Sequence, residues 1–142
     1  MEVLNSLLLW VHLAALGVVG AAVFGIPILA AKMASVDGPG KEALGKGMMA
    51  LSKAGASALG TMIVVGLIMI WTAFEGPANM PWIFWVKMLL VVVAIGNIIL
   101  GRRNAMKAMS GDAAAAARQP KFAMAGIALV LAIVLCAVVA FR

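Results

Sequence analysis

The sequence predicts an all-helical integral membrane protein, on the basis of its composition, the spacing of its apolar runs and the placement of its basic residues. Hydrophobic residues occupy 65% of the 142 positions, charged residues occupy 11%, and the mean hydropathy is +1.15. Soluble domains usually carry about 25% charged residues. A chain of this length cannot hide so much apolar surface inside a globule, because small domains leave much of their surface in water.

Four apolar segments are long enough to cross a bilayer, whose hydrocarbon core of about 30 Å requires roughly 20 helical residues. The predicted spans are about 4–31, 54–74, 82–100 and 122–141. The first is interpreted as a permanent helix rather than a signal peptide, because its apolar run is too long and it lacks a basic start. We therefore expect one transmembrane domain over residues 1–142, folded as a four-helix bundle.

The basic residues predict the orientation of these spans. Of the eleven Lys and Arg residues, four lie in the connection at about 32–53 and five in the connection at about 101–121. The positive-inside rule makes both connections cytoplasmic loops and leaves both termini outside, in the periplasm of a bacterium with the protein in its inner membrane. The loops lack the aromatic or groove-reading features of nucleic-acid binding, so no nucleic-acid partner is expected. Contact with anionic headgroups explains their charge.

Small residues predict where helices approach each other, because lipid tails give no hydrophobic drive for helix association. Gly17, Ala21 and Gly25 recur every four residues on the first span. This stripe suits a tight bundle or a contact with another chain. The expected partners are membrane lipids together with a second copy of the chain or a larger membrane complex.

His12, the only histidine of the chain, lies within the first span, roughly 12 Å along the helix axis from its outer start. Ionisable groups in a membrane usually face the bundle or a cavity. A neutral imidazole is also a common ligand of haem iron and other metals. Two interpretations stay open: His12 is a metal or haem ligand with Gly20 allowing close approach of the porphyrin, or it is structural and donates to a neighbouring carbonyl.

Three further polar residues require an explanation. Lys87 lies in the outer half of the third span, where it could snorkel to the interface or pair with a carboxylate, such as a haem propionate or Glu75. Glu75 is placed at the outer end of the second span, and Asn97 is expected to bond to another helix. The eleven methionines are scattered, so copper is a weaker expectation than haem, since Met commonly serves as adaptable packing.

Two stretches carry a family resemblance. "LLLWVHLAALGVVGAAVFGIPIL", residues 7–29, resembles the first helix of the CopD-type copper-resistance membrane domain and of HemJ-type protoporphyrinogen oxidases. "FWVKMLLVVVAIGNIILGRRNAMKA", residues 84–108, is similar to a later helix of these families. The resemblance implies a four-helix inner-membrane bundle in which His12 ligates haem b and Lys87 supports it. HemJ-type proteins carry a further histidine where this chain has Gly96 and Asn97.

These observations give three functional hypotheses. In the first, the chain binds haem b near the outer face and takes part in electron transfer or redox chemistry, and any enzymatic role would be that of a membrane oxidoreductase. In the second, it is a non-catalytic accessory subunit that packs against a larger respiratory or photosynthetic complex. In the third, ranked behind both, it is a component of copper handling or transport.

Overall fold

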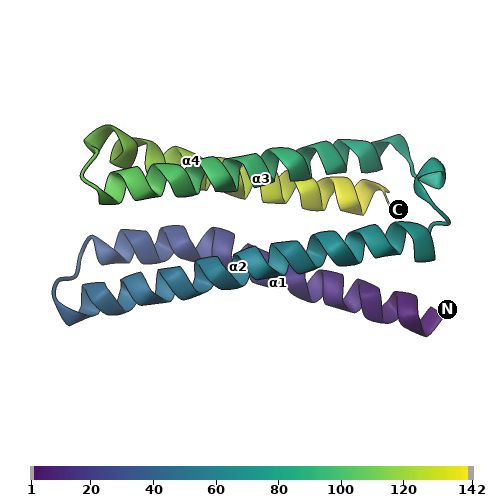
Figure 1. Ribbon diagram of the computed structural model, residues 1–142, viewed down its shortest axis with the longest axis horizontal. Coiled ribbons are helices and arrows are strands. Elements are labelled where there is room, and N and C mark those ends of the chain that lie inside the picture. Colours follow the sequence, from purple (N-terminus) through teal and green to yellow (C-terminus); the bar gives the residue numbers. More distant parts are fainter. Residues whose placement is uncertain (1, 141–142) are drawn as a thin grey trace. The chain divides into compact units, whose positions relative to one another are not determined.

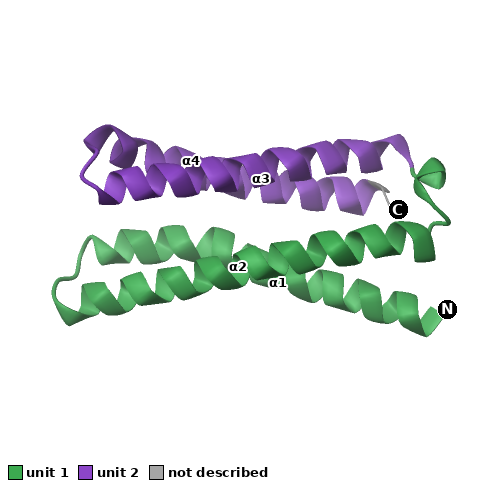
Figure 2. Cartoon of the chain, viewed as in Figure 1, with its two compact units in different colours: residues 1–80 green, residues 81–142 purple. Residues whose placement is uncertain are grey.

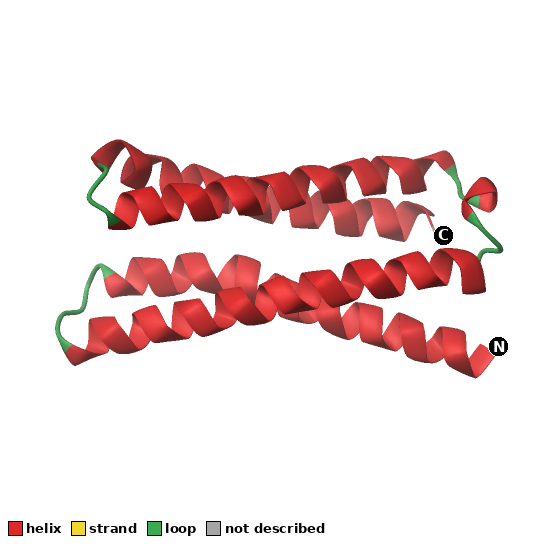
Figure 3. Ribbon diagram, viewed as in Figure 1, coloured by secondary structure: helices red, strands yellow, loops and turns green. Residues whose placement is uncertain are grey.

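The computed structural model describes residues 2–140, and its regular elements over that range are all helical (Figures 1 and 3). Four long helices and one short 3-10 turn follow each other along the chain. They are α1 (Glu2–Met33), α2 (Pro39–Thr72), η1 (Pro77–Asn79), α3 (Trp82–Met109) and α4 (Ala113–Ala140). Each α-helix is long and apolar enough to cross a membrane. This confirms the prediction of an all-α chain with four helices of membrane-spanning length.

The chain divides into two compact units, residues up to Met80 and residues from Pro81 on (Figure 2). The first unit is a hairpin of α1 packed on α2, and the second is a hairpin of α3 packed on α4. The expectation that residues 1–142 form a single domain and a single bundle stays a prediction.

All the helices except α1 extend well beyond the apolar spans on the side of the basic residues. Regular structure is interrupted there only at residues 34–38 and 110–112. The two predicted cytoplasmic loops, residues 32–53 and 101–121, are therefore mostly helical. Hydropathy marks where a helix would leave the lipid, whereas the helix itself continues through Ala, Leu, Met and Lys, which are all good helix formers.

Residues with positive φ set the helix ends. Gly38 has φ of 59° directly before Pro39, the first residue of α2. Such a φ costs glycine little, and proline at the first helical position loses no helical hydrogen bond. Gly111, with φ of 98°, makes the corresponding turn between α3 and α4. At the other end of α2, Gly76 N–H donates to the Ile70 carbonyl at 2.9 Å and closes the helix.

The contact between α1 and α2 follows a seam with the heptad spacing of coiled coils. Buried or half-buried positions recur alternately every three and four residues on both helices. On α1 they are Asn5, Leu8, His12, Ala15, Val19, Ala22, Ile26, Leu29 and Met33, and on α2 Leu44, Met48, Leu51, Gly55, Ala58, Met62, Val65, Met69 and Thr72. This spacing keeps one face of each helix against its neighbour over the length of the hairpin.

The two backbones of the first hairpin approach each other closely at Gly55. A Cβ built on Gly55 would lie 2.6 Å from the Cβ of Ala22, closer than side-chain atoms approach in practice. Small residues at a helix contact allow such an approach. The stripe of Gly17, Ala21 and Gly25 that the sequence predicted as a contact lies mostly outside it. Ala21 is exposed and a Cβ on Gly17 would meet open space, so only Gly25, near Leu51, lies at the contact. The small residues of the seam follow the heptad spacing instead of a four-residue repeat.

The second hairpin has an equivalent seam. Its positions on α3 are Lys87, Leu90, Ala94, Asn97, Gly101, Asn104 and Ala108, and on α4 Ala115, Gln119, Phe122, Gly126, Leu129, Ile133 and Cys136. Gly101 lies against Phe122, with the built Cβ 3.4 Å from the phenylalanine Cβ. That pair fixes the antiparallel register of the two helices.

Most of the apolar surface lies outside these seams. Within its own structure the chain buries 17% of the most apolar stretch of α1 and of α2, and 6% of that of α3 and of α4. Leu, Ile, Val and Trp side chains cover the remaining surface. Soluble monomers rarely expose apolar patches of more than a few hundred Å², so lipid or another protein is needed to cover this surface.

Candidate functional site

His12 lies in the seam of the first hairpin and faces Gly66 of α2. A Cβ built on Gly66 would lie 3.3 Å from Cε1 and 3.6 Å from Nδ1 of His12. The imidazole is half-buried, and its Nδ1 is fully buried. The missing side chain at Gly66 therefore provides the space that the imidazole ring occupies between the helices.

Gly20, predicted to allow close approach of a porphyrin, lies on the same helix at the edge of the seam. A Cβ built there would meet no atom within 4 Å, so the surface beside it is open within the first hairpin. Gly20 is half-buried, as is His12. The imidazole of His12 is thus held between the helices, and the space beside Gly20, two turns further along α1, is unfilled.

Asn5 is a polar seam residue that the sequence reasoning missed. Its side-chain Nδ2 donates to the Thr72 carbonyl of α2 at 3.1 Å. Its Oδ1 is buried and makes no hydrogen bond within the described part of the chain. Asn5 precedes His12 by seven residues, and this heptad spacing is the sequence signal that would have placed both on one face.

Two asparagines close the second hairpin. Asn97, predicted to bond across to another helix, donates from Nδ2 to the Phe122 carbonyl at 3.1 Å. Asn104 is buried and donates to the Ala115 carbonyl and to Gln119 Oε1, both at 2.8 Å. Asn104 falls in a segment that was predicted to be a loop, which is why its role could not be seen from hydropathy alone.

Lys87 also occupies a seam position, where it is half-buried. The register set by Gly101 and Phe122 places it level with Cys136 of α4. Lys87 belongs to the second hairpin, whereas Glu75 lies exposed in the turn after α2 with φ of 57°. The predicted pairing of Lys87 with Glu75, or with a haem propionate at His12, stays a prediction.

No group of three or more His, Cys, Asp or Glu side chains that could hold a metal ion lies among the described residues. A single imidazole as an axial ligand of haem is a different kind of site, which needs no such group.

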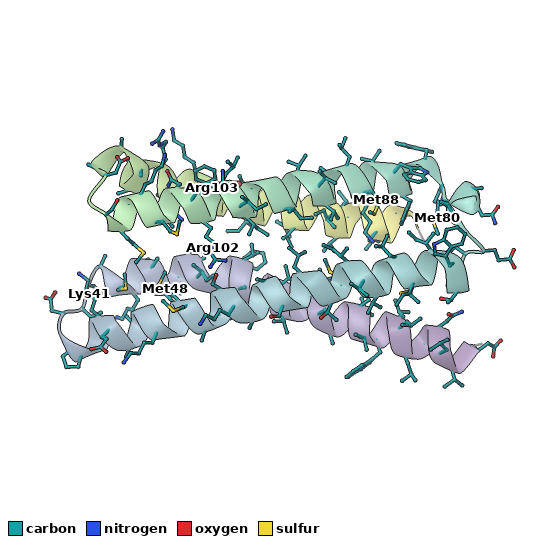
Figure 4. The ribbon with its side chains drawn as sticks, in the orientation of Figure 1. Lys41, Met48, Met80, Met88, Arg102 and Arg103 are labelled. Atoms are coloured by element: carbon teal, nitrogen blue, oxygen red, sulfur yellow. The ribbon has the colours of Figure 1, made fainter. Side chains whose placement is uncertain are left out.

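The second hairpin also has an open cavity of about 290 Å³ beside its seam. Asn97, Arg118, Lys121, Phe122 and Ala125 line it. Asn97 comes from α3 and the other four residues from one stripe of α4, since they are spaced three, four and seven residues from Arg118. Arg102 and Arg103 lie on α3 near this level (Figure 4). Neither residue lines the cavity.

No protein-family model, curated protein or solved structure matches the chain significantly. The similarity to CopD-type and HemJ-type proteins therefore stays a prediction that depends on the two stretches around His12 and Lys87.

Proposed function

We propose that the chain is an integral protein of the bacterial cytoplasmic membrane that crosses the bilayer four times, with both termini outside. Its helices have 28 to 34 residues, more than the roughly 20 that a bilayer core requires. Their large exposed apolar surface is suited to lipid. Nine of the eleven Lys and Arg residues lie within 32–53 and 101–121, the segments around the 34–38 and 110–112 connections, which the positive-inside rule assigns to the cytoplasm.

Within the membrane, we propose that the chain is a non-catalytic accessory subunit that packs against a larger membrane complex. The observation that carries this proposal is that the asparagine side chains within the predicted spans bond to the neighbouring helix. Asn5 and Asn97 both donate to a carbonyl of the neighbouring helix, so these groups serve to close the hairpins. The side chains that face away from the seams are mainly apolar, so they can pack against another protein but provide few groups that could react or bind a ligand.

Purification from native membranes in a mild detergent tests this role. The accessory proposal expects a particle much heavier than the 14.6 kDa chain that contains other membrane subunits in fixed ratio, whereas this chain purified alone is colourless. A particle that contains only copies of this chain would replace the larger complex by a homo-oligomer. A detergent-solubilised monomer that shows an absorption band of haem would contradict the accessory role.

Haem b ligation by His12 is the second candidate, and the seating of the imidazole favours it. Ligating histidines usually have one ring nitrogen oriented by the protein, and Nδ1 of His12 is buried in the seam. Nε2 would then be the nitrogen that holds the iron, and the open surface at Gly20 would admit one porphyrin face. These residues fit haem as a single axial ligand, and bound haem would supply one-electron redox chemistry.

Visible spectra of the purified protein, oxidised and reduced, separate the two candidates. Haem ligation predicts a Soret band that His12→Ala abolishes and that a matched seam variant, Asn97→Ala, retains. Both variants remove one half-buried polar side chain from a seam, so a general loss of packing would affect them alike. A band retained in His12→Ala would exclude His12 as the ligand.

A further inference from the structure

We propose that the cavity lined by Asn97, Arg118 and Lys121 binds the phosphate of an anionic phospholipid from the cytoplasmic leaflet, with an acyl chain running along Phe122 and Ala125. This inference rests on the proposed membrane location. It assigns the α3/α4 cavity a ligand, which neither the accessory role nor the haem candidate requires.

The depth of the cavity relative to the bilayer supports a lipid. From Trp82 to Arg102 there are twenty residues, roughly 30 Å of helix, which matches the hydrocarbon core. Because Gly101 lies against Phe122, Lys121 is level with Arg102 at the cytoplasmic end of this core. The two cationic residues of the cavity, Arg118 and Lys121, therefore lie at the level of the lipid phosphates.

The lining of the cavity changes with depth from cationic to apolar side chains, as a phospholipid changes from its phosphate to its acyl chains. Arg118 and Lys121 are exposed and one helical turn apart on α4, and neither takes part in a recorded ion pair among the described residues. Phe122 and Ala125 lie on the deeper, apolar side of the cavity. Two cations above an apolar floor complement a phosphate diester above its acyl chains.

Asn97 adds a polar contact on the deeper side of the cavity, where its Nδ2 lies 3.4 Å from a Cβ built on Gly126. Its side-chain nitrogen carries two hydrogens, and one is donated to the Phe122 carbonyl at 3.1 Å. A second donor therefore remains at the cavity wall for an ester oxygen of the lipid, which lies deeper in the bilayer than the phosphate. The net charge of the surrounding connection also favours an anion, since Asp112 is its only acidic residue and already caps α4 through the Ala115 N–H at 3.0 Å.

The proposal is tested by reconstituting the chain into equimolar phosphatidylcholine and phosphatidylglycerol vesicles, then extracting it gently for native mass spectrometry. We expect phosphatidylglycerol to be the preferred bound lipid. Each cation near a membrane surface is worth about 1 kcal/mol towards anionic lipid, or roughly a fivefold preference. Arg118→Gln/Lys121→Gln should therefore lower the ratio of bound phosphatidylglycerol to phosphatidylcholine by at least about fivefold.

The matched control is Arg102→Gln/Arg103→Gln, which removes the same charge at nearly the same depth outside the cavity and should retain the preference. Ala125→Trp fills the cavity without changing charge, and should remove the bound lipid. Equal loss in both double variants, or full binding in Ala125→Trp, would overturn the site. Displacement by excess inorganic phosphate would show a free-anion site and also overturn it. Failure of the wild-type chain to insert into vesicles would refute the membrane proposal instead.

Discussion

Replacing Gly55 by alanine tests the close approach of α1 to α2. The new Cβ would lie 2.6 Å from the Cβ of Ala22, whereas carbon atoms in contact are ordinarily about 3.5–4.0 Å apart. Neither atom belongs to a flexible side chain, so the helices must separate by roughly 1 Å. Forcing an extra methyl group into a packed contact costs about 1–3 kcal/mol.

Gly60→Ala is the matched control on the same helix. A Cβ there would meet nothing within 4 Å, and the position is exposed. Both substitutions gain roughly 0.5–1 kcal/mol because alanine loses less backbone entropy than glycine on entering a helix. The free energy of unfolding of Gly55→Ala should therefore lie about 1–3 kcal/mol below that of Gly60→Ala.

The assay is a titration of the detergent-solubilised chain with SDS, followed by tryptophan fluorescence. Removing Trp82 and Trp85 leaves Trp10 of α1 and Trp71 of α2 to report on the first hairpin. Equal transition midpoints for the alanine variants of Gly55 and Gly60 would refute the heptad seam as the place where the two helices are in closest contact.

Two further substitutions test individual seam contacts. Asn104→Ala removes the donor of the hydrogen bonds to Ala115 and Gln119, both 2.8 Å long. It should lower stability by about 1–2 kcal/mol in an SDS titration of a chain that keeps Trp82 and Trp85 of α3 and lacks Trp10 and Trp71, so that the fluorescence reports on the second hairpin. A midpoint equal to that of the parent chain would contradict the contribution of these hydrogen bonds. Gly66→Ala places a Cβ 3.3 Å from Cε1 of His12, so the ring must shift by a few tenths of an ångström. The imidazole resonances of His12 in an NMR spectrum should therefore change. Unchanged resonances would show that His12 does not face Gly66.

The sequence predicted the class of fold because hydropathy reports directly on lipid contact. It could not predict where α2 begins, since residues 39–53 are too polar for the membrane and yet form good helix. The positions of the turns depended on Gly38 and Gly111, whose positive φ values are a property of the backbone and leave no trace in hydropathy.

The seam could not be found from hydrophobic periodicity, because apolar residues surround each helix almost evenly. In a soluble helix the buried face is the apolar one, whereas here it is marked by small and polar residues such as Asn5, His12 and Gly55. A search for those residue types at heptad spacing would have placed Asn5 and His12 together. It would also have joined Asn97 to Asn104, seven residues apart on α3.

The proposed function depends most on the passage of both hairpins through the bilayer with their basic ends in the cytoplasm. In a Cys136→Ser background, single cysteines at Asn79 and Ser110 can be labelled in intact cells by a maleimide that does not cross membranes. We predict that position 79 reacts at once and that position 110 reacts only after the membrane is opened. Labelling of position 110 in intact cells, with position 79 protected, would contradict the proposed orientation.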